Sequence, residues 1–280
     1  MSRDGDMRLQ GVIFDWAGTL VDHGSRAPVA TMQRVFAKAG VPVTAAEVRL
    51  SMGIAKLDHI RSILQVPRVA AAFEKEWVAA LDARGTDGHA PALYREFVPM
   101  QLECLGEYSD LIAGVAETAE GLRSRGIAIG STTGYTREML DFLVERARAQ
   151  GFAPDCSVSP EDVPGGGRPA PWMCYLNAIR LKVTPFRSMV KIGDTPSDIE
   201  EGLNAGMWTV GVTRTGNEAG LSKAEWEAAS ADARAVVIDV ARTRLIAAGA
   251  HYLVESAGEC LSVIDEISDR VAAGERPDFH

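Results

Sequence analysis

The stretch LQGVIFDWAGTLVD at residues 9–22 decides the fold. Its first part, Leu9 to Phe14, is a short and almost wholly apolar run, which is typical of a β-strand buried on both faces of a sheet. The run ends directly at Asp15, and Gly18 allows a tight turn close to a ligand. Active sites of open parallel sheets form at the carboxyl ends of the strands, so Asp15 is a candidate reactive group.

Further apolar runs follow at intervals along the chain, and helical patterns separate them. Strands that alternate with helices favour a parallel sheet covered by helices on both faces, which is a doubly wound α/β core. The expected strands are 9–14, 127–132, 188–193, 208–212 and 251–254, and the expected helices between and after them are 137–150, 196–204 and 257–273. Residues 219–244 are also helical in pattern and charged.

A helical segment interrupts this pattern directly after the first strand. Helical spacing covers residues 27–39, 44–64, 69–83 and 92–105. Thr44 and Glu47 have the spacing of a capping box, which starts the second of these helices. We therefore expect two domains, an α/β core of residues 1–24 and 106–280 and a helical cap of residues 25–105.

The composition of the chain argues against several functional classes of protein. The chain has 280 residues, a net charge of −9 and 46% hydrophobic residues, and such an acidic protein is a poor non-specific binder of nucleic acid. No apolar run is long enough to span a membrane, and the charged start of the chain lacks the apolar centre of a signal peptide. The four cysteines form no C-x-x-C pair, which favours reduced thiols. We expect a soluble, cytoplasmic protein.

Candidate catalytic groups follow three of the strands. Asp15 and Asp194 are carboxylates that the fold would bring together, and such a pair of oxygen ligands favours Mg²⁺. One oxygen of Asp15 could bind the metal while the other attacks phosphorus. Thr133 precedes a helix and offers a hydroxyl and backbone N–H groups to a phosphoryl oxygen, and Arg168 could supply positive charge.

Two nearby residues have simpler explanations. Asp198 lies three residues after Thr195 with Pro196 between them, so it is either the cap of a helix or part of the metal site, and the two roles are compatible. Ser25 lies in the turn that enters the helical segment, where it could touch a phosphoryl group, although a plain loop serine explains it equally simply.

In their order along the chain, these motifs resemble the haloacid dehalogenase superfamily. Its phosphotransferases carry D-x-D-G-T, then Ser or Thr, then Lys or Arg, and finally an acidic G-D-x-x-x-D motif. This sequence departs from the first motif at Ala17, where the superfamily usually has the acid that protonates an alkoxide leaving group. A carbon leaving group would need an electron sink instead, which a lysine Schiff base next to a carbonyl supplies.

The helical segment contains a lysine suited to this task. Lys56 and His59 are three residues apart, hence on one face of the expected helix, and Met52 lies one turn earlier. Spacing alone would more often mean a solvated lysine and an incidental histidine. However, the set also resembles the phosphonoacetaldehyde hydrolase branch of the superfamily, which shows D-x-A-G-T, M-G-x-x-K-x-x-H, T-G-Y and G-R-P-x-P-W-M. The matching stretches are 15–19, 52–59, 133–135 and 167–173.

The resemblance implies a reaction and its residues. It implies cleavage of a carbon–phosphorus bond through a Schiff base on Lys56 and an aspartyl phosphate on Asp15, with proton transfer by His59. The implied ligands of Mg²⁺ are Asp15, the carbonyl of Ala17 and Asp194. The implied binding residues for a small phosphonate substrate are Met52, Thr133, Gly134, Tyr135 and Arg168. A homodimer that pairs through the cap is also implied.

Two other functions remain open at this stage. A generic phosphatase or phosphoglucomutase would use the same core, although Ala17 leaves no acid for the departing oxygen. A pseudoenzyme or scaffold would bind a partner through the helical segment, although the joint presence of Asp15, Thr133, Arg168 and Asp194 argues against it.

Overall fold

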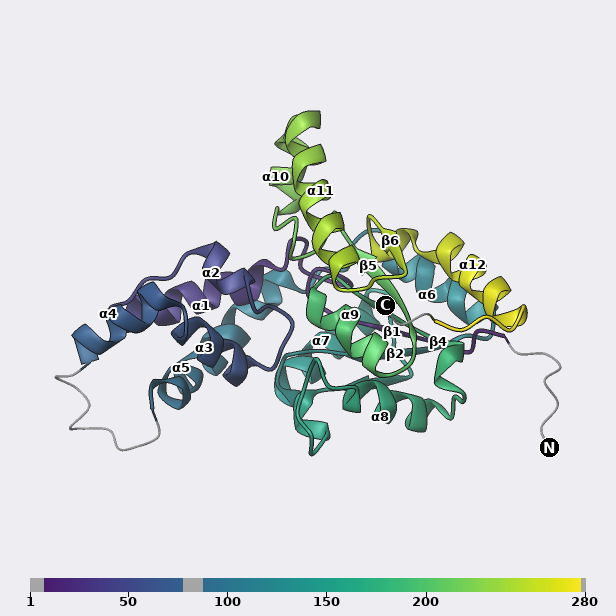
Figure 1. Ribbon diagram of the computed structural model, residues 1–280, viewed down its shortest axis with the longest axis horizontal. Coiled ribbons are helices and arrows are strands. Elements are labelled where there is room, and N and C mark those ends of the chain that lie inside the picture. The colour runs from purple at the N-terminus through teal and green to yellow at the C-terminus, as the bar shows by residue number, and fades with distance from the viewer. Residues whose placement is uncertain (1–7, 78–87, 278–280) are drawn as a thin grey trace.

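The computed structural model describes residues 8–77 and 88–277. Its centre is a six-stranded, fully parallel sheet in the order β3-β2-β1-β4-β5-β6 (Figure 1). The strands are β1 (Gly11–Phe14), β2 (Ala128–Thr132), β3 (Cys156–Val158), β4 (Met189–Gly193), β5 (Trp208–Val212) and β6 (Tyr252–Val254). The strand order changes direction at β1, which lies between β2 and β4, and this places the end of β1 at the switch point of the sheet.

Helices cover both faces of the sheet, which confirms the doubly wound core. Side chains alternate along a strand, so Val12 and Phe14 pack into the larger apolar cluster while Ile13 packs into a second cluster on the opposite face. The core helices are α6 (Val115–Ser124), α7 (Arg137–Ala149), α8 (Trp172–Leu181), α9 (Pro196–Asn204), α10 (Lys223–Ala228), α11 (Ala231–Ala247) and α12 (Leu261–Ala272). Short 3₁₀ helices are η2 (Gly106–Tyr108), η3 (Pro160–Asp162), η4 (Phe186–Ser188) and η5 (Ala257–Glu259).

Five helices between β1 and η2 form a separate group beside the sheet, at the left of Figure 1. They are α1 (Arg26–Lys38), α2 (Ala45–Arg49), α3 (Lys56–Leu64), α4 (Pro67–Trp77) and α5 (His89–Leu105). The capping box of Thr44 and Glu47 is present at the start of α2. The helix expected over 69–83 corresponds to α4, and its residues from 78 onward lie outside the described residues. The exact bounds of a cap domain stay a prediction.

The continuous helix expected over 44–64 is wrong. The chain leaves the helical conformation after Arg49 and forms a turn, residues 50–55, before α3 starts at Lys56. Gly53 has a φ of +93° in this turn, a conformation that interrupts a right-handed helix and that glycine adopts readily. Met52 therefore lies in the turn and not one helical turn before Lys56.

One strand and one local contact were not expected from the sequence. β3 has only three residues and follows Pro154, so it carries too little pattern to be recognised. The two linkers to the helical group meet in a bridge between Val21 and Leu111. Helices α10 and α11 form a hairpin that projects from the body of the protein at the top of Figure 1. No helix among the described residues has the length and apolar character needed to cross a lipid bilayer.

Candidate active site

Three carboxylates meet at the switch point of the sheet. Asp15 follows β1, Asp194 follows β4 and Asp198 lies in the first turn of α9, and one oxygen of each lies within 4.8 Å of the others. Burial and the neighbouring Asp198 raise the pKa of Asp15, although Arg168 opposes this. Burial, Asp15 and Asp198 raise the pKa of Asp194 well above its usual range. This crowding of buried acids favours a divalent cation with oxygen ligands.

The turn after β1 is packed tightly against Asp194. A Cβ atom at Gly18 would lie 2.2 Å from Oδ2 of Asp194, so this position requires glycine. The hydroxyl of Thr19 donates to Oδ1 of Asp194 at 3.2 Å, and the backbone N–H of Asn217 donates to Oδ2 at 2.7 Å. Both oxygens of Asp194 therefore have fixed positions beside Asp15.

Arg168 lies beneath the carboxylates and is fully buried. Its Nη2 is 2.7 Å from Oδ1 of Asp15, and its Nη1 is 2.9 Å from Oδ1 of Asp198. The Thr195 hydroxyl also donates to Asp198 at 2.6 Å in the capping box of α9. Burial alone would raise the pKa of Asp198, but Arg168 and Lys191 hold it below its ordinary value. Asp198 thus caps α9 and neutralises two cations, while its geometry also allows a place in the metal site.

Lys191 and Glu201 complete this network, and the sequence analysis missed both. Nζ of Lys191 is 2.7 Å from Oδ1 of Asp198, and Oε2 of Glu201 accepts from Nε of Arg168 at 2.8 Å and from the Thr132 hydroxyl at 3.0 Å. Both side chains are completely buried. A single lysine in the otherwise apolar strand β4 was the available sign, because a buried lysine needs a carboxylate partner.

The second predicted motif contacts the helical group. Thr133 directly follows β2, and its hydroxyl accepts from the backbone N–H of Tyr135 at 3.1 Å. A Cβ atom at Gly134 would lie 2.3 Å from the carbonyl oxygen of Ile54, in the turn before α3. The same turn accepts a hydrogen bond from Arg168 through the Gly53 carbonyl at 3.1 Å. The turn of residues 50–55 is therefore docked directly onto the core.

Lys56 begins α3 and points into the space over the core. It is only 5% exposed, and its Nζ lies 4.9 Å from the centre of the Tyr135 ring. Burial is the main cause that lowers the pKa of Lys56 to about 8; Asp15 opposes this shift and Arg168 adds to it. A larger fraction of this amine is neutral near pH 7 than for a solvated lysine, and the neutral form is the one that a nucleophilic lysine needs.

His59 lies one turn further along α3, completely buried. Its Nε2 is 2.6 Å from the carbonyl oxygen of Val48, and its Nδ1 has no hydrogen-bond partner among the described residues. Burial, with Lys56 contributing, lowers the pKa of His59 to about 3, so the ring is neutral. A neutral His59 adds no positive charge beside Lys56, whose lowered pKa results from burial and from Arg168.

A small cavity joins most of the predicted residues. About 20 Å³ in volume, it holds roughly one water molecule. His59 is not part of its lining. The predicted residues that line it are Asp15, Ala17, Ser25, Met52, Lys56, Thr133, Gly134, Tyr135, Arg168 and Asp194.

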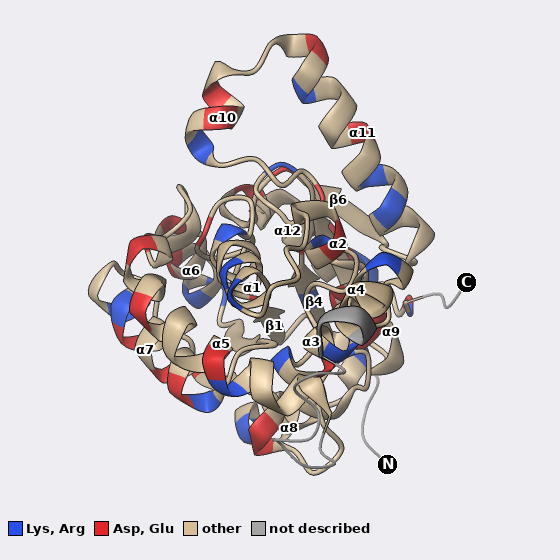
Figure 2. Cartoon of the chain, turned by 90° about the vertical axis from the view of Figure 1, so that its left-hand side faces the viewer, with Lys and Arg blue, Asp and Glu red and all other residues tan. Residues whose placement is uncertain are grey.

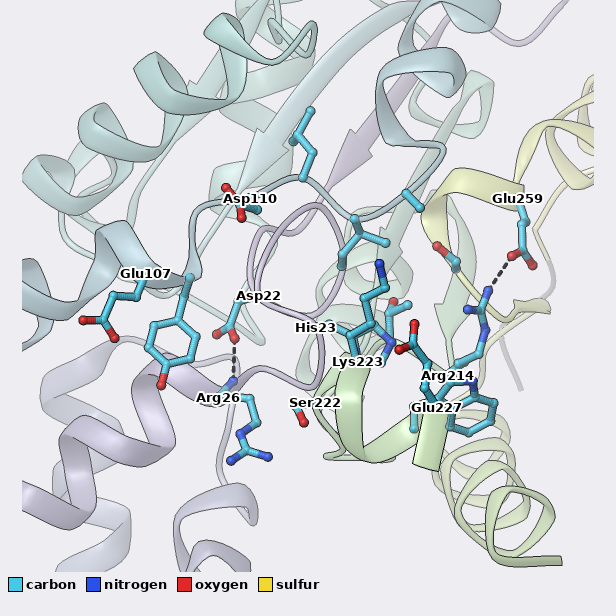
Figure 3. Close-up of a pocket in the computed structure, with 17 residues that line it drawn as sticks. Asp22, His23, Arg26, Glu107, Asp110, Arg214, Ser222, Lys223, Glu227 and Glu259 are labelled. Atoms are coloured by element: carbon cyan, nitrogen blue, oxygen red, sulfur yellow. Dashed lines mark hydrogen bonds and ion pairs between the residues drawn. The ribbon is translucent and has the colours of Figure 1, made fainter. Parts of the chain in front are cut away.

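A much larger cavity, about 710 Å³, lies beside the two segments that connect the helical group to the core (Figure 3). Asp22 and His23 of the first linker, Tyr108 before the second linker and Trp226 of α10 are among its lining residues. None of the residues predicted for catalysis, substrate or metal lines it.

Comparison with known proteins places this geometry in context. Residues 9–206 match the family described as haloacid dehalogenase-like hydrolase. Phosphonoacetaldehyde hydrolase from Bacillus cytotoxicus is 46% identical over 93% of this chain and 97% of its own length. The enzyme of that name from Bacillus cereus is 45% identical over the same shares.

Two solved structures are similar to this chain in fold. A phosphonoacetaldehyde hydrolase like protein from Oleispira antarctica has a TM-score of 0.90 at 38% identity and covers 99% of this chain, while this chain covers all of it. A β-phosphoglucomutase from Clostridium difficile has a TM-score of 0.67 at 16% identity, covering 95% of this chain and 99% of its own, which shows a shared fold only.

Proposed function

Because the chain belongs to the haloacid dehalogenase-like hydrolases, and within them to the family of the phosphonoacetaldehyde hydrolases, we propose that it hydrolyses phosphonoacetaldehyde to acetaldehyde and phosphate. One observation carries the proposal. A buried lysine with a lowered pKa, Lys56, shares a small cavity with the carboxylate of Asp15, and Ala17 lies where an acid for an alkoxide leaving group would be expected.

The first half of the proposed reaction takes place on Lys56. Its neutral amine adds to the aldehyde, and loss of water gives an iminium ion next to the C–P bond. His59 is proposed to move protons in this step, because its Nε2–H donates to Val48 and its unpaired Nδ1 is then an acceptor. Met52 and Tyr135 shape the pocket around the carbonyl end of the substrate.

The second half takes place on Asp15. Its carboxylate attacks phosphorus, the C–P bond breaks, and the electron pair enters the iminium to give an enamine. Thr133, Gly134 and Arg168 are proposed to hold the phosphoryl oxygens. Water then hydrolyses the aspartyl phosphate to phosphate and free Asp15, and protonation and hydrolysis of the enamine release acetaldehyde and Lys56.

Magnesium is proposed as the cofactor. The donor set fits it, because Asp15, the Ala17 carbonyl and Asp194 offer oxygen atoms, and burial together with the neighbouring carboxylates raises the pKa of both acids. When bound, Mg²⁺ would neutralise charge on the carboxylates and on the phosphoryl group.

The helical group, residues 25–105, is proposed to act as a cap that opens for substrate. A cavity of about 20 Å³ cannot admit an aldehyde with a phosphonate group, so the structure corresponds to a closed form. The turn of residues 50–55 would separate from Gly134 and Arg168 on opening, carrying Lys56 away from Asp15.

Replacement of Lys56 by arginine tests the mechanism. Lys56→Arg keeps a long cation but cannot form an imine, so we expect no release of acetaldehyde or phosphate and an unchanged circular dichroism spectrum. Borohydride should inactivate the unmodified enzyme only with substrate present. Lys38→Arg, on the exposed face of α1, is the matched control and should retain activity.

The same experiment separates this function from its nearest rival. Substantial activity of Lys56→Arg towards phosphonoacetaldehyde would refute the Schiff base. Rapid turnover of an aryl phosphate, with none of phosphonoacetaldehyde, would assign the protein to the phosphatases that share its core fold. We also propose a cytoplasmic location and, from the family, a homodimer through the cap, which sedimentation of a Leu50→Asp variant would test because Leu50 is 68% exposed.

A further inference from the structure

Helix α11 carries two apolar stripes on opposite faces. The inner stripe is Ile238, Ala241 and Leu245, of which the last two are completely buried where the helix packs against α9 and β5. The outer stripe is Ala233, Val236, Val240, Thr243 and Ala247, and every member is exposed. A surface helix normally has one apolar stripe, which packs on the core. The second, outer stripe therefore indicates a contact with another molecule.

Exposure of the outer stripe is unusual for this protein. Val236 is 64% exposed and Val240 is 41% exposed. With Ile246 they are three of the six large hydrophobic side chains that are exposed in the part of the chain that the structure describes. The hairpin of α10 and α11 stands clear of the rest of the molecule (Figure 2).

The hairpin is held in this projecting position. Arg234 donates from Nε to the Trp226 carbonyl and from Nη2 to the Glu227 carbonyl, both at 2.8 Å, and its guanidinium lies 5.3 Å from the Trp226 ring centre. These contacts tie the first turns of α11 to α10. The outer stripe is therefore presented on a fixed helix, and little conformational entropy would be lost on binding.

The spacing of the outer stripe identifies a helix as its partner. Its members are separated by three, four, three and four residues, which is the a and d repeat of a coiled coil. Small Ala and Val side chains at these positions allow close approach of a second helix. Helix α11 of a second copy of the protein carries the identical stripe and can therefore pair with it.

Charges beside the stripe select the direction of pairing. Asp239 and Arg244 occupy g and e positions, five residues apart, so in a parallel pair Asp239 faces Arg244 of the second copy. In an antiparallel pair centred on the stripe, Asp239 would face its own counterpart. Arg244 also bonds Glu218 at 2.6 Å, and its side chain is still 49% exposed and available.

We propose that the outer stripe of α11 is a self-association surface, which pairs in parallel with α11 of a second copy. The helix has 17 residues, about 25 Å, so the contact is small and we expect a dissociation constant on the order of micromolar. The surface is distinct from the cap and does not depend on the proposed reaction.

Sedimentation velocity over a range of concentrations tests the surface. In a Leu50→Asp background, which is designed to remove the dimer proposed through the cap, the protein should still associate, and adding Val236→Asp and Val240→Asp should weaken that association at least about 100-fold, because it places unpaired carboxylates in the interface. Its hydrolytic activity and circular dichroism should not change. Ile179→Asp on α8 introduces the same charge at a side chain that is 68% exposed, and in the same background it should not change this contact.

Cross-linking tests the direction. Val240 would face Val240 in a parallel pair, so Val240→Cys should form a disulfide-linked dimer under mild oxidation, whereas the unmodified protein, whose described cysteines are buried or half-buried, should not. A Leu50→Asp variant that is monomeric at about 100 μM overturns the proposal, as does association of that variant that Ile179→Asp abolishes and the two valine substitutions do not. Failure of Val240→Cys to cross-link overturns parallel pairing.

Discussion

The reactivity of Lys56 should depend on pH in a way that its burial dictates. Burial lowers its pKa from the ordinary 10.5 to about 8, and the neutral amine is the form that attacks an aldehyde. At pH 7 about one amine in ten is then neutral, against about one in three thousand at the ordinary pKa, which is a gain of about 300-fold. Because raising the pH removes the proton, imine formation should rise tenfold per unit below pH 8 and level off above it.

Trapping of the imine measures this directly. The enzyme is incubated with acetaldehyde and cyanoborohydride between pH 6 and pH 10, and the modification of Lys56 is followed by mass spectrometry. Exposed Lys38 in the same sample provides the reference for the trapping chemistry itself. A profile that continues to rise until about pH 10 would refute the argument, because Lys56 would then behave as a solvated lysine.

Three further predictions follow from the packing of the site. Gly134→Ala should lower kcat/KM about 100-fold, because its Cβ would lie 2.3 Å from the Ile54 carbonyl and displace the turn before Lys56, whereas Gly106→Ala, with its nearest atom at 3.9 Å, should be tolerated in the same assay. Lys191→Met should cost about 3–5 kcal/mol in urea unfolding, because two buried carboxylates lose one of the two cations that they share, whereas Lys38→Met, at an exposed ion pair, should cost less than about 1 kcal/mol. Chelation should abolish turnover and Mg²⁺ should restore it and raise Tm, and an unchanged Tm with Mg²⁺ would contradict binding at the acidic cluster.

The sequence was sufficient for the sheet because each long strand is an apolar run that ends at a polar residue. Asp15 and Asp194 follow such runs, and their meeting at one edge follows from parallel strands. β3 was missed because three residues after a proline form no pattern. The helix over 44–64 was predicted too long, because helical spacing continues across Gly53 and only the backbone shows the turn.

The network of buried ion pairs beneath the site could not be predicted from the sequence, for a different reason. Glu201 and Arg168 are 33 residues apart, and nothing local indicates that they form an ion pair. The position of Lys56 was predictable only through its family motif, since its burial depends on Tyr135 and on the docking of the turn against Gly134.

The docked turn has a consequence for inhibition. The phosphoryl-binding groups belong to the core, while Lys56 belongs to the helical group and comes into place only when the turn closes on Gly134 and Arg168. In the proposed reaction each half of the substrate is thus recognised by a different body of the protein. A phosphonate without a carbonyl and an aldehyde without a phosphonate would each occupy one half, so the two should inhibit together more strongly than the sum of their separate effects.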